Sequence, residues 1–260
     1  MPLPAMIDLE QVSKDYGGQR VVDHVSLRVE PGELLVLLGE SGSGKTTTCK
    51  MINRLIEPSS GSIRVAGQDV RDLDGHVLRR RIGYAFQRLG LFPHLTVAEN
   101  IGITPRLLGW DAARIQARVH TLLELVELDP ARMRDRLPSE LSGGQAQRVA
   151  VARALAAEPP VLLLDEPFGA LDPPTRERLQ LSFDRIRRDL GLTAVFVTHD
   201  VTEAMLLADR VAVLKDGRLL QWGTFRELVS QAADPYVREL VSAPRRQARL
   251  LQSRLGDLGE

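Results

Sequence analysis

The chain contains 260 residues, and its 34 Lys and Arg are matched by 34 Asp and Glu, so the formal net charge at pH 7 is zero. Hydrophobic residues at 43% and charged residues at 26% are typical of a globular protein, and they exclude a disordered chain, a collagen and a disulfide scaffold. The charge balance argues against a protein that coats nucleic acid, because such a protein needs an excess of Lys and Arg.

The sequence predicts no segment that targets or crosses a membrane. Met1–Glu10 has no basic cluster and no apolar run, so we expect no signal peptide. The longest apolar runs, such as Leu34–Leu38, are far too short to span a bilayer. The single cysteine, Cys49, cannot form an internal disulfide, which is consistent with a reducing compartment.

Short apolar runs recur along the chain and alternate with segments of helical pattern. Runs of four or five apolar residues between helices are typical of buried parallel strands, so we predict an α/β fold. Asp216–Gly217 predicts a tight hairpin turn, because this pair supplies the positive φ that the turn needs. The predicted strands, in chain order, are Ile7–Val12, Val21–Val29, Leu34–Leu38, Ile82–Phe86, Val161–Leu164, Ala194–Val197 and Val211–Leu214.

Helical patterns fill the segments between these strands. Thr46–Leu55 is compatible with a helix directly after the third strand. The tail after Ala243 predicts either a short amphipathic helix or a frayed end, since several arginines alternate with leucines there. One face of another predicted helix carries Ile115, Val119, Leu122, Leu123 and Val126.

Two helix starts carry capping signals. Asp172 before Pro173 predicts an N-cap followed by a first-turn proline. Asp200 and Glu203 have the spacing of a capping box, which predicts a helix that begins at Val201.

The segment Gly39–Thr46 has the pattern G-x-x-x-x-G-K-[ST] and lies between a predicted strand and a predicted helix. Its glycines allow the backbone to wrap around an anion, and the helix N-terminus adds positive potential. In such a loop Lys45 reaches the β- and γ-phosphates and Thr46 coordinates Mg²⁺. The segment therefore predicts a nucleotide-binding site.

A second acidic element follows the apolar strand Val161–Leu164, which ends in Asp165 and Glu166. A strand end beside the phosphate loop brings Asp165 near Mg²⁺. Glu166 is then placed to polarise an attacking water.

The segment Leu141-Ser142-Gly143-Gly144-Gln145 resembles the signature motif of ATP-binding-cassette (ABC) ATPases. The residues that follow, Ala146–Ala157, predict a helix, so the motif forms a second helix N-terminus suited to an anion. One ATP does not need two such cradles from one chain. The economical explanation is that the signature of one subunit closes over the ATP of another, which predicts a head-to-tail nucleotide-bound dimer.

The resemblance implies roles for further residues. Tyr16 matches the aromatic residue that stacks on adenine, and Gln87 matches the glutamine that contacts Mg²⁺ and links to the transport partner. Ala170–Asp172 matches the loop that contacts the opposite subunit, and His199 matches the histidine that contacts the γ-phosphate. The implied catalytic residues are Glu166, His199, Lys45 and Gln87, and the implied metal ligands are Thr46, Gln87 and Asp165. The implied nucleotide-binding residues are Tyr16, Gly39, Ser41, Gly42, Ser43, Gly44, Lys45, Thr46, Thr47, Ser142, Gly143, Gly144, Gln145 and Asp172.

The resemblance covers residues 6–240 as one ABC ATP-binding domain, followed by a short tail at 241–260. It implies a P-loop NTPase (RecA-like) core, an antiparallel β subdomain, and a helical signature subdomain at about 88–157. Roughly ninety residues separate the phosphate loop from the signature, too few for the long coiled coils of chromosome-maintenance relatives. Clusters of Cys and His are also absent from the sequence, so DNA-repair relatives are disfavoured.

Three segments, Met51–Pro58, Gly90–Val97 and Pro105–Trp110, resemble the branch of importers for osmoprotectants such as glycine betaine, choline and carnitine. They surround the nucleotide core and do not touch cargo, so they indicate lineage rather than substrate. Many members of that branch carry paired regulatory domains after the cassette. About twenty residues follow Leu240, too few for such a domain, so we expect no regulation by that route.

Together these features imply an ATP-hydrolysing subunit of an importer that uses ATP and Mg²⁺. The implied partners are a second copy of the chain, integral membrane permease subunits and, indirectly, a solute-binding protein, with no nucleic acid. The implied location is the cytoplasm, peripheral on the inner face of the cell membrane, and the region after Gln87 is the candidate contact with the permease. Alternatives are an importer of another small solute, an exporter subunit, and a soluble ABC ATPase that acts on ribosomes or DNA.

Overall fold

Six strands form the central sheet of the computed structural model, which describes residues 5–86 and 90–256. Their order is β10-β9-β3-β8-β7-β6, and every neighbouring pair is parallel except β9 with β10. The predicted parallel strands and the hairpin are confirmed, and the turn residues Asp216 and Gly217 have φ of 48° and 78°. The strands are β3 (Leu34–Leu38), β6 (Ile82–Ala85), β7 (Val161–Asp165), β8 (Thr193–Thr198), β9 (Arg210–Lys215) and β10 (Arg218–Gly223).

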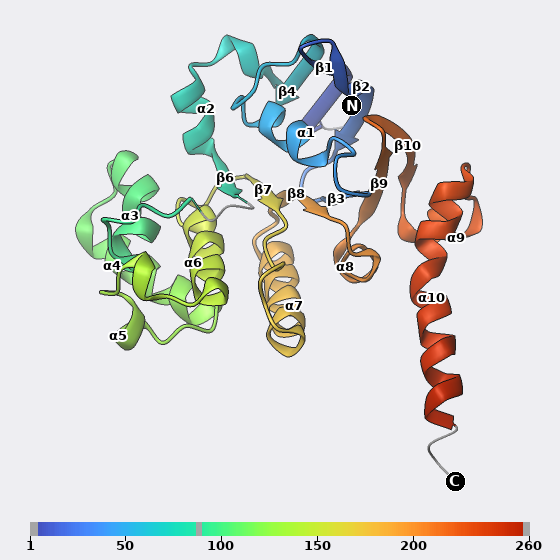
Figure 1. The fold of residues 1–260 in the computed structure, drawn as a ribbon. Helices are drawn as coiled ribbons and strands as arrows, with labels where there is room; N and C mark the ends of the chain where they lie inside the picture. The colour runs from blue at the N-terminus through green and yellow to red at the C-terminus, as the bar shows by residue number, and fades with distance from the viewer. Residues whose placement is uncertain (1–4, 87–89, 257–260) are drawn as a thin grey trace.

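β3 lies inside this sheet, and helices cover both faces around it (Figure 1). All five residues of β3 are buried, because successive side chains point to opposite faces and pack in two separate core clusters. α1 (Lys45–Ile52) packs on one face, and α7 (Pro173–Asp189) and α8 (Val201–Leu207) pack on the other. The rigid strand fixes the position of the loop that follows it.

A second, antiparallel sheet closes the core over α1. Its order is β2-β1-β4-β5, and its inward side chains share a cluster with α1 and with alternate residues of β3. This sheet agrees with the expected antiparallel β subdomain. The strands are β1 (Ile7–Tyr16), β2 (Gln19–Val29), β4 (Ser60–Val65) and β5 (Gln68–Asp69).

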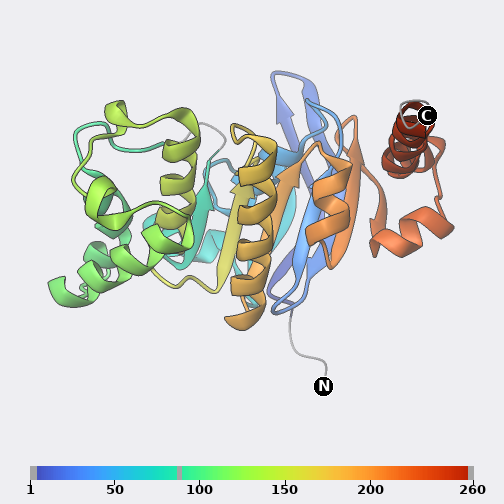
Figure 2. The same cartoon turned by 90° about the horizontal axis from the view of Figure 1, so that it is seen from below.

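A group of helices projects from the β6–β7 edge of the sheet (Figures 1 and 2). The predicted apolar face of α4 (Ala112–Leu125) is confirmed, since its four apolar side chains and Val126 are all buried. The signature segment begins α6 (Gly143–Leu155), which packs against the other helices of this group. The remaining members are α3 (Val97–Leu107), α5 (Pro130–Met133) and the short 3₁₀ turn η2 (Pro138–Glu140).

One of the two predicted caps is correct and the other is wrong in part. Asp172 caps α7 as predicted, accepting a hydrogen bond from the Thr175 backbone N–H at 3.1 Å. Asp200 caps α8, which begins at Val201 as predicted. The capping box is wrong, because the Glu203 carboxylate does not return to the start of the helix. It points into the protein, where it accepts two hydrogen bonds from other elements.

The C-terminal segment is helical through residue 256. α10 (Pro235–Gly256) is one continuous helix that contains residue 241. Its first half packs against α8 and α9 (Phe225–Ser230), and its second half extends away from the other elements (Figure 1). The remaining helical elements are η1 (Val70–Asp72) and α2 (Gly75–Arg81). Within the described residues, no helix combines the length and apolar character needed to cross a membrane.

Candidate functional site

The loop between β3 and α1 lines a cavity of about 140 Å³. Gly44 takes φ of 96° at the start of α1, in the left-handed region that favours glycine. A Cβ atom there would lie 2.8 Å from the Val21 carbonyl oxygen, so a side chain at this position would collide with β2. The lining residues are Val21, Ser41, Gly42, Ser43, Gly44, Lys45, Thr46, Thr47 and Glu166.

Oxygens of the loop hold the Lys45 ammonium at this cavity. Nζ donates to the carbonyl oxygens of Gly39 at 2.7 Å and Glu40 at 2.6 Å, and to Ser43 Oγ at 3.3 Å. Burial lowers the pKa of Lys45, while the nearby Glu166 and Asp165 carboxylates oppose that shift. A lysine held in this way presents a desolvated positive charge to an anion in the loop.

Thr46 and Asp165 meet beside the same cavity. Thr46 Oγ1 donates to Asp165 Oδ1 at 2.9 Å, and burial raises the pKa of Asp165 while this hydrogen bond opposes the rise. The described residues contain no group of three or more His, Cys, Asp and Glu side chains that could hold a metal ion. Mg²⁺ in nucleotide sites usually binds one or two protein oxygens and completes its shell with phosphates and water. The hydroxyl and the carboxylate therefore fit a Mg²⁺ that binds together with a nucleotide.

Glu166 and His199 form the second pair at the site. His199 Nδ1 lies 3.0 Å from Glu166 Oε1. Glu166 takes a left-handed conformation, with φ of 49°, and its backbone N–H donates to the Val197 carbonyl at 3.0 Å. This turn, directly after β7, directs the Glu166 side chain to the cavity, which it helps to line.

Sequence reasoning missed Gln147, which stands on α6 and is only 6% exposed. Its Nε2 donates to the Glu166 carbonyl oxygen at 3.0 Å, and its Oε1 accepts from the Ala170 backbone N–H at 2.9 Å. Gln147 thereby ties the signature helix to the segment that carries Glu166. A polar residue between apolar neighbours on a buried helix face was the signal available in the sequence.

The signature residues stand at the N-terminus of α6. Ser142 caps the helix by accepting from the Gln145 backbone N–H at 3.2 Å, while the Ser142 N–H donates to Gln145 Oε1 at 2.9 Å. A Cβ atom on Gly144 would lie 3.1 Å from the Leu171 side chain, so this glycine allows close packing on the loop before α7. Of the described residues that line the phosphate-loop cavity, none belongs to Ser142–Gln145.

Three other predicted residues lie farther from this cavity or outside the described residues. Tyr16 ends β1 and is 44% exposed, with Lys14 Nζ at 5.0 Å from its ring centroid. Asp172 caps α7, and the hydrogen bond from the Thr175 backbone lowers the pKa of Asp172. Gln87 lies outside the described residues.

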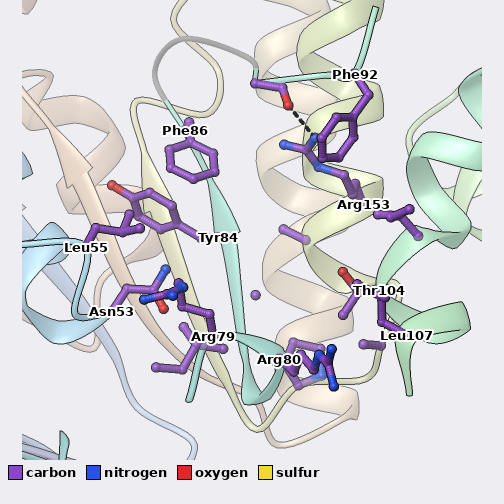
Figure 3. A pocket seen from close by; sticks show the side chains of 17 residues that line it. Asn53, Leu55, Arg79, Arg80, Tyr84, Phe86, Phe92, Thr104, Leu107 and Arg153 are labelled. Carbon is purple, nitrogen blue, oxygen red and sulfur yellow. Dashed lines mark hydrogen bonds between the residues drawn. The ribbon is translucent and has the colours of Figure 1, made fainter. Parts of the chain in front are cut away.

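A larger groove of about 270 Å³ lies between α2, β6, α3 and α6 (Figure 3). Arg79, Arg80 and Arg153 face it together with apolar side chains such as Phe92 and Leu107, and none of the described residues that line it is acidic. Arg153 Nη1 donates to the Gly90 carbonyl oxygen at 2.6 Å. The groove combines an apolar surface with positive charge.

The fold and the phosphate loop define this chain as a P-loop NTPase-type protein. A sequence model of the family described as ABC transporter matches residues 22–169. The chain belongs to the ABC transporter family.

Curated relatives include importer subunits for several solutes. The glycine betaine/carnitine/choline transport ATP-binding protein OpuCA of Bacillus subtilis (strain 168) is 51% identical over 96% of this chain and 64% of its own length. The osmoprotectant import ATP-binding protein OsmV of Salmonella typhimurium is 49% identical over 97% of this chain and 68% of its length. A sulfate/thiosulfate import ATP-binding protein, CysA 2 of Shewanella oneidensis, is 46% identical over 90% of this chain and 66% of its length. This chain thus spans slightly less than two thirds of the Bacillus relative.

Two solved structures of the ABC transporter cassette MJ0796 share the fold. A dimeric structure is 36% identical, with a TM-score of 0.79 over 84% of this chain and 98% of that chain. A dimeric post-hydrolysis state bound to ADP and phosphate is 34% identical, with the same TM-score and coverage.

Proposed function

We propose that this chain is the ATP-hydrolysing subunit of an importer for quaternary-amine osmoprotectants such as glycine betaine, choline or carnitine. The observation that carries the hydrolytic part is the pairing of Glu166 with His199 at the phosphate-loop cavity. The names of the relatives that match almost the whole chain support the cargo class.

The site binds the triphosphate through the loop amides and Lys45, which neutralise phosphate charge. Thr46 and Asp165, with Gln87 as the resemblance implies, would hold Mg²⁺, which would supply further neutralisation of phosphate charge. Tyr16 provides a surface for the adenine ring.

Hydrolysis needs a group that takes a proton from the attacking water. Glu166 accepts that proton as its carboxylate lies in the cavity, and His199, held at 3.0 Å from it, contacts the γ-phosphate. The turn that gives Glu166 positive φ and the bridge from Gln147 keep the carboxylate in place.

Two copies are proposed to assemble head to tail. Residues Ser142–Gln145 and Asp172 of one copy then complete the phosphate cradle of the other, which is why they do not line the cavity of their own chain. The dimeric structures of the MJ0796 cassette support the assembly of two copies. ATP favours the closed dimer because each new anion contact forms only on closure, and hydrolysis weakens it.

The basic, apolar groove in Figure 3 is the proposed seat of a cytoplasmic loop from an integral membrane permease. It borders residue 90, directly after the segment that contains Gln87, so nucleotide contacts and permease contacts are neighbours along the chain. The protein is then cytoplasmic and peripheral on the inner face of the cell membrane, and a solute-binding protein delivers the cargo.

Glu166→Gln tests the hydrolytic role. The variant should bind ATP with wild-type affinity, lose at least about 100-fold in turnover and accumulate as an ATP-bound dimer in size-exclusion chromatography. Lys45→Ala is the contrasting variant, because it should lose nucleotide affinity and form no such dimer. Wild-type turnover by Glu166→Gln would refute the role assigned to Glu166.

An importer of another small solute is the second candidate, since sulfate/thiosulfate import proteins match almost as much of the chain. The test is co-expression with the permease and binding-protein genes beside its own gene, followed by ATP-driven uptake into vesicles. Uptake of labelled glycine betaine, and not of sulfate, supports the osmoprotectant proposal; the reverse result overturns the cargo class. Stable recovery with ribosomes or DNA, and not with a multi-span membrane protein, would overturn transport itself.

A further inference from the structure

The Glu203 side chain stands in the first turn of α8 but is turned into the protein, where only 7% of the residue is exposed. Its Oε2 accepts a hydrogen bond from Thr198 Oγ1 at 2.5 Å. Its Oε1 accepts a second one from Gln180 Nε2 at 2.8 Å. Both of its oxygens are therefore used to join other elements.

Burial of the Glu203 carboxyl group favours the one conformation in which both of its hydrogen bonds are made. Burial raises the pKa of Glu203, and the hydrogen bonds from Thr198 and Gln180 oppose the shift; the charges of Asp200 and Arg176 act on it in opposite directions. A buried carboxyl group is costly unless its hydrogen bonds are made, so the two donors and Glu203 hold one another in a single arrangement.

The two donors lie on segments that carry functional residues. Thr198 ends β8, directly before His199, and its Oγ1 also accepts from the Asp200 backbone N–H at 2.9 Å. The hydroxyl thus fixes the backbone on both sides of His199. Gln180 stands on α7, the helix that begins after Asp172 in the loop proposed to face the second copy.

We propose that Glu203 is a positioning residue for His199. Through Thr198 it sets the turn that brings His199 Nδ1 to 3.0 Å from Glu166, and through Gln180 it ties that turn to α7. The inference rests on the proposed ATP hydrolysis. It adds that Glu203 links α7 to the turn that carries His199, so the position of α7 affects the position of His199.

Steady-state ATPase kinetics of Glu203→Ala and Glu203→Gln test the proposal. In Glu203→Ala the Thr198 hydroxyl and the Gln180 amide lose their acceptor, so kcat should fall about tenfold or more while KM for ATP stays unchanged. In Glu203→Gln the new amide accepts from Thr198, and a rotated Gln180 amide accepts from it, so kcat should return close to wild type. Wild-type kcat in Glu203→Ala, or equal losses in both variants, overturns the proposal.

A double variant separates positioning from a general structural role. In single-turnover measurements, Glu203→Ala should cause no further loss in a His199→Ala background, because its effect acts through His199. A further tenfold loss there would show that Glu203 acts by another route and would overturn the proposal.

Thr198→Val provides a second approach if Glu203→Ala does not fold. Valine has the shape of threonine without the hydroxyl, so kcat should fall with KM unchanged, while Thr198→Ser keeps the hydroxyl and should keep the rate. Equal kcat for the two Thr198 variants contradicts the proposal. Absence of ATPase activity in the wild-type chain with its permease would instead refute the proposed function, so the two failures are distinguishable.

Discussion

Thr46 Oγ1 and Asp165 Oδ1 lie 2.9 Å apart although 119 positions of sequence separate them. Thr46 follows β3 and Asp165 ends β7, and β8 lies between these two strands in the sheet. The contact therefore forms only after β8 has paired with both neighbours. The strand order brings the carboxyl ends of β3 and β7 to the same edge of the sheet, and this places Thr46 beside Asp165, the proposed metal-binding pair.

Thr46→Val should lower the affinity of the site for Mg²⁺, because it removes the Thr46 hydroxyl that lies beside the buried Asp165. The Mg²⁺ concentration for half-maximal ATPase activity should rise at least about tenfold. Thr46→Ser keeps the oxygen and is the matched control. An identical Mg²⁺ titration for the two variants would contradict the assignment.

Gln147→Leu should slow hydrolysis without weakening ATP binding. It removes the hydrogen bond from Gln147 Nε2 to the Glu166 carbonyl and the one from the Ala170 N–H to Gln147 Oε1, so the turn that presents Glu166 loses its anchor on α6. We expect kcat to fall about tenfold, with ATP affinity by calorimetry unchanged. Gln147→Glu still accepts from Ala170 but cannot donate to Glu166, so an equally low kcat in both variants points to the Glu166 contact. Normal turnover in Gln147→Leu would show that the bridge is dispensable.

Arg187→Met should lower stability and leave the nucleotide site intact. Arg187 is 2% exposed, and it donates to the Gly32 carbonyl at 2.8 Å and to Asp184 and Asp209 at 2.9 Å each. Loss of the guanidinium removes these hydrogen bonds, although Asp184 keeps its ion pair with Arg188 and Asp209 keeps the Leu34 backbone N–H, so we expect a cost of about 2 kcal/mol in urea denaturation. Arg188→Met is the control, since that exposed ion pair to Asp184 should contribute below about 1 kcal/mol. Equal losses of stability in Arg187→Met and Arg188→Met would contradict the stabilising role assigned to the buried Arg187.

Asp23 should make stability depend on acid pH. Hydrogen bonds from His24, then Arg20 and Arg218, lower the pKa of Asp23 from 3.8 to about 2 in the folded chain. Its stabilising contribution is therefore complete above pH 3.8 and is lost as the pH falls through about 2. Asp23→Asn should flatten this part of the Tm–pH profile, measured between these limits by circular dichroism. A slope equal to that of wild type would exclude Asp23 as its source.

Local patterns predicted several features well. The phosphate loop, the Asp172 cap and the apolar face of α4 depend on residues within a few positions of one another, so their spacing is visible in the chain. The predicted capping box at α8 was wrong for a physical reason, although Asp200 does cap the helix. The spacing of Asp200 and Glu203 allows a capping box, but donors on β8 and α7 take the Glu203 carboxylate instead.

Hydrogen bonding within a turn and burial of one helix face leave short-range patterns, so the sequence by itself was enough to predict the phosphate loop, the cap of α7 and the apolar face of α4. The resemblance to the family also rests on a short segment, the signature motif Leu141–Gln145. The sequence led us to expect Asp165 beside the phosphate loop, but it does not give the hydrogen bond of Asp165 with Thr46, or those of His199 with Glu166 and of Gln147 with two backbone groups. These hydrogen bonds come from the way distant strands and helices pack, since they can form only after the sheet has brought the segments together.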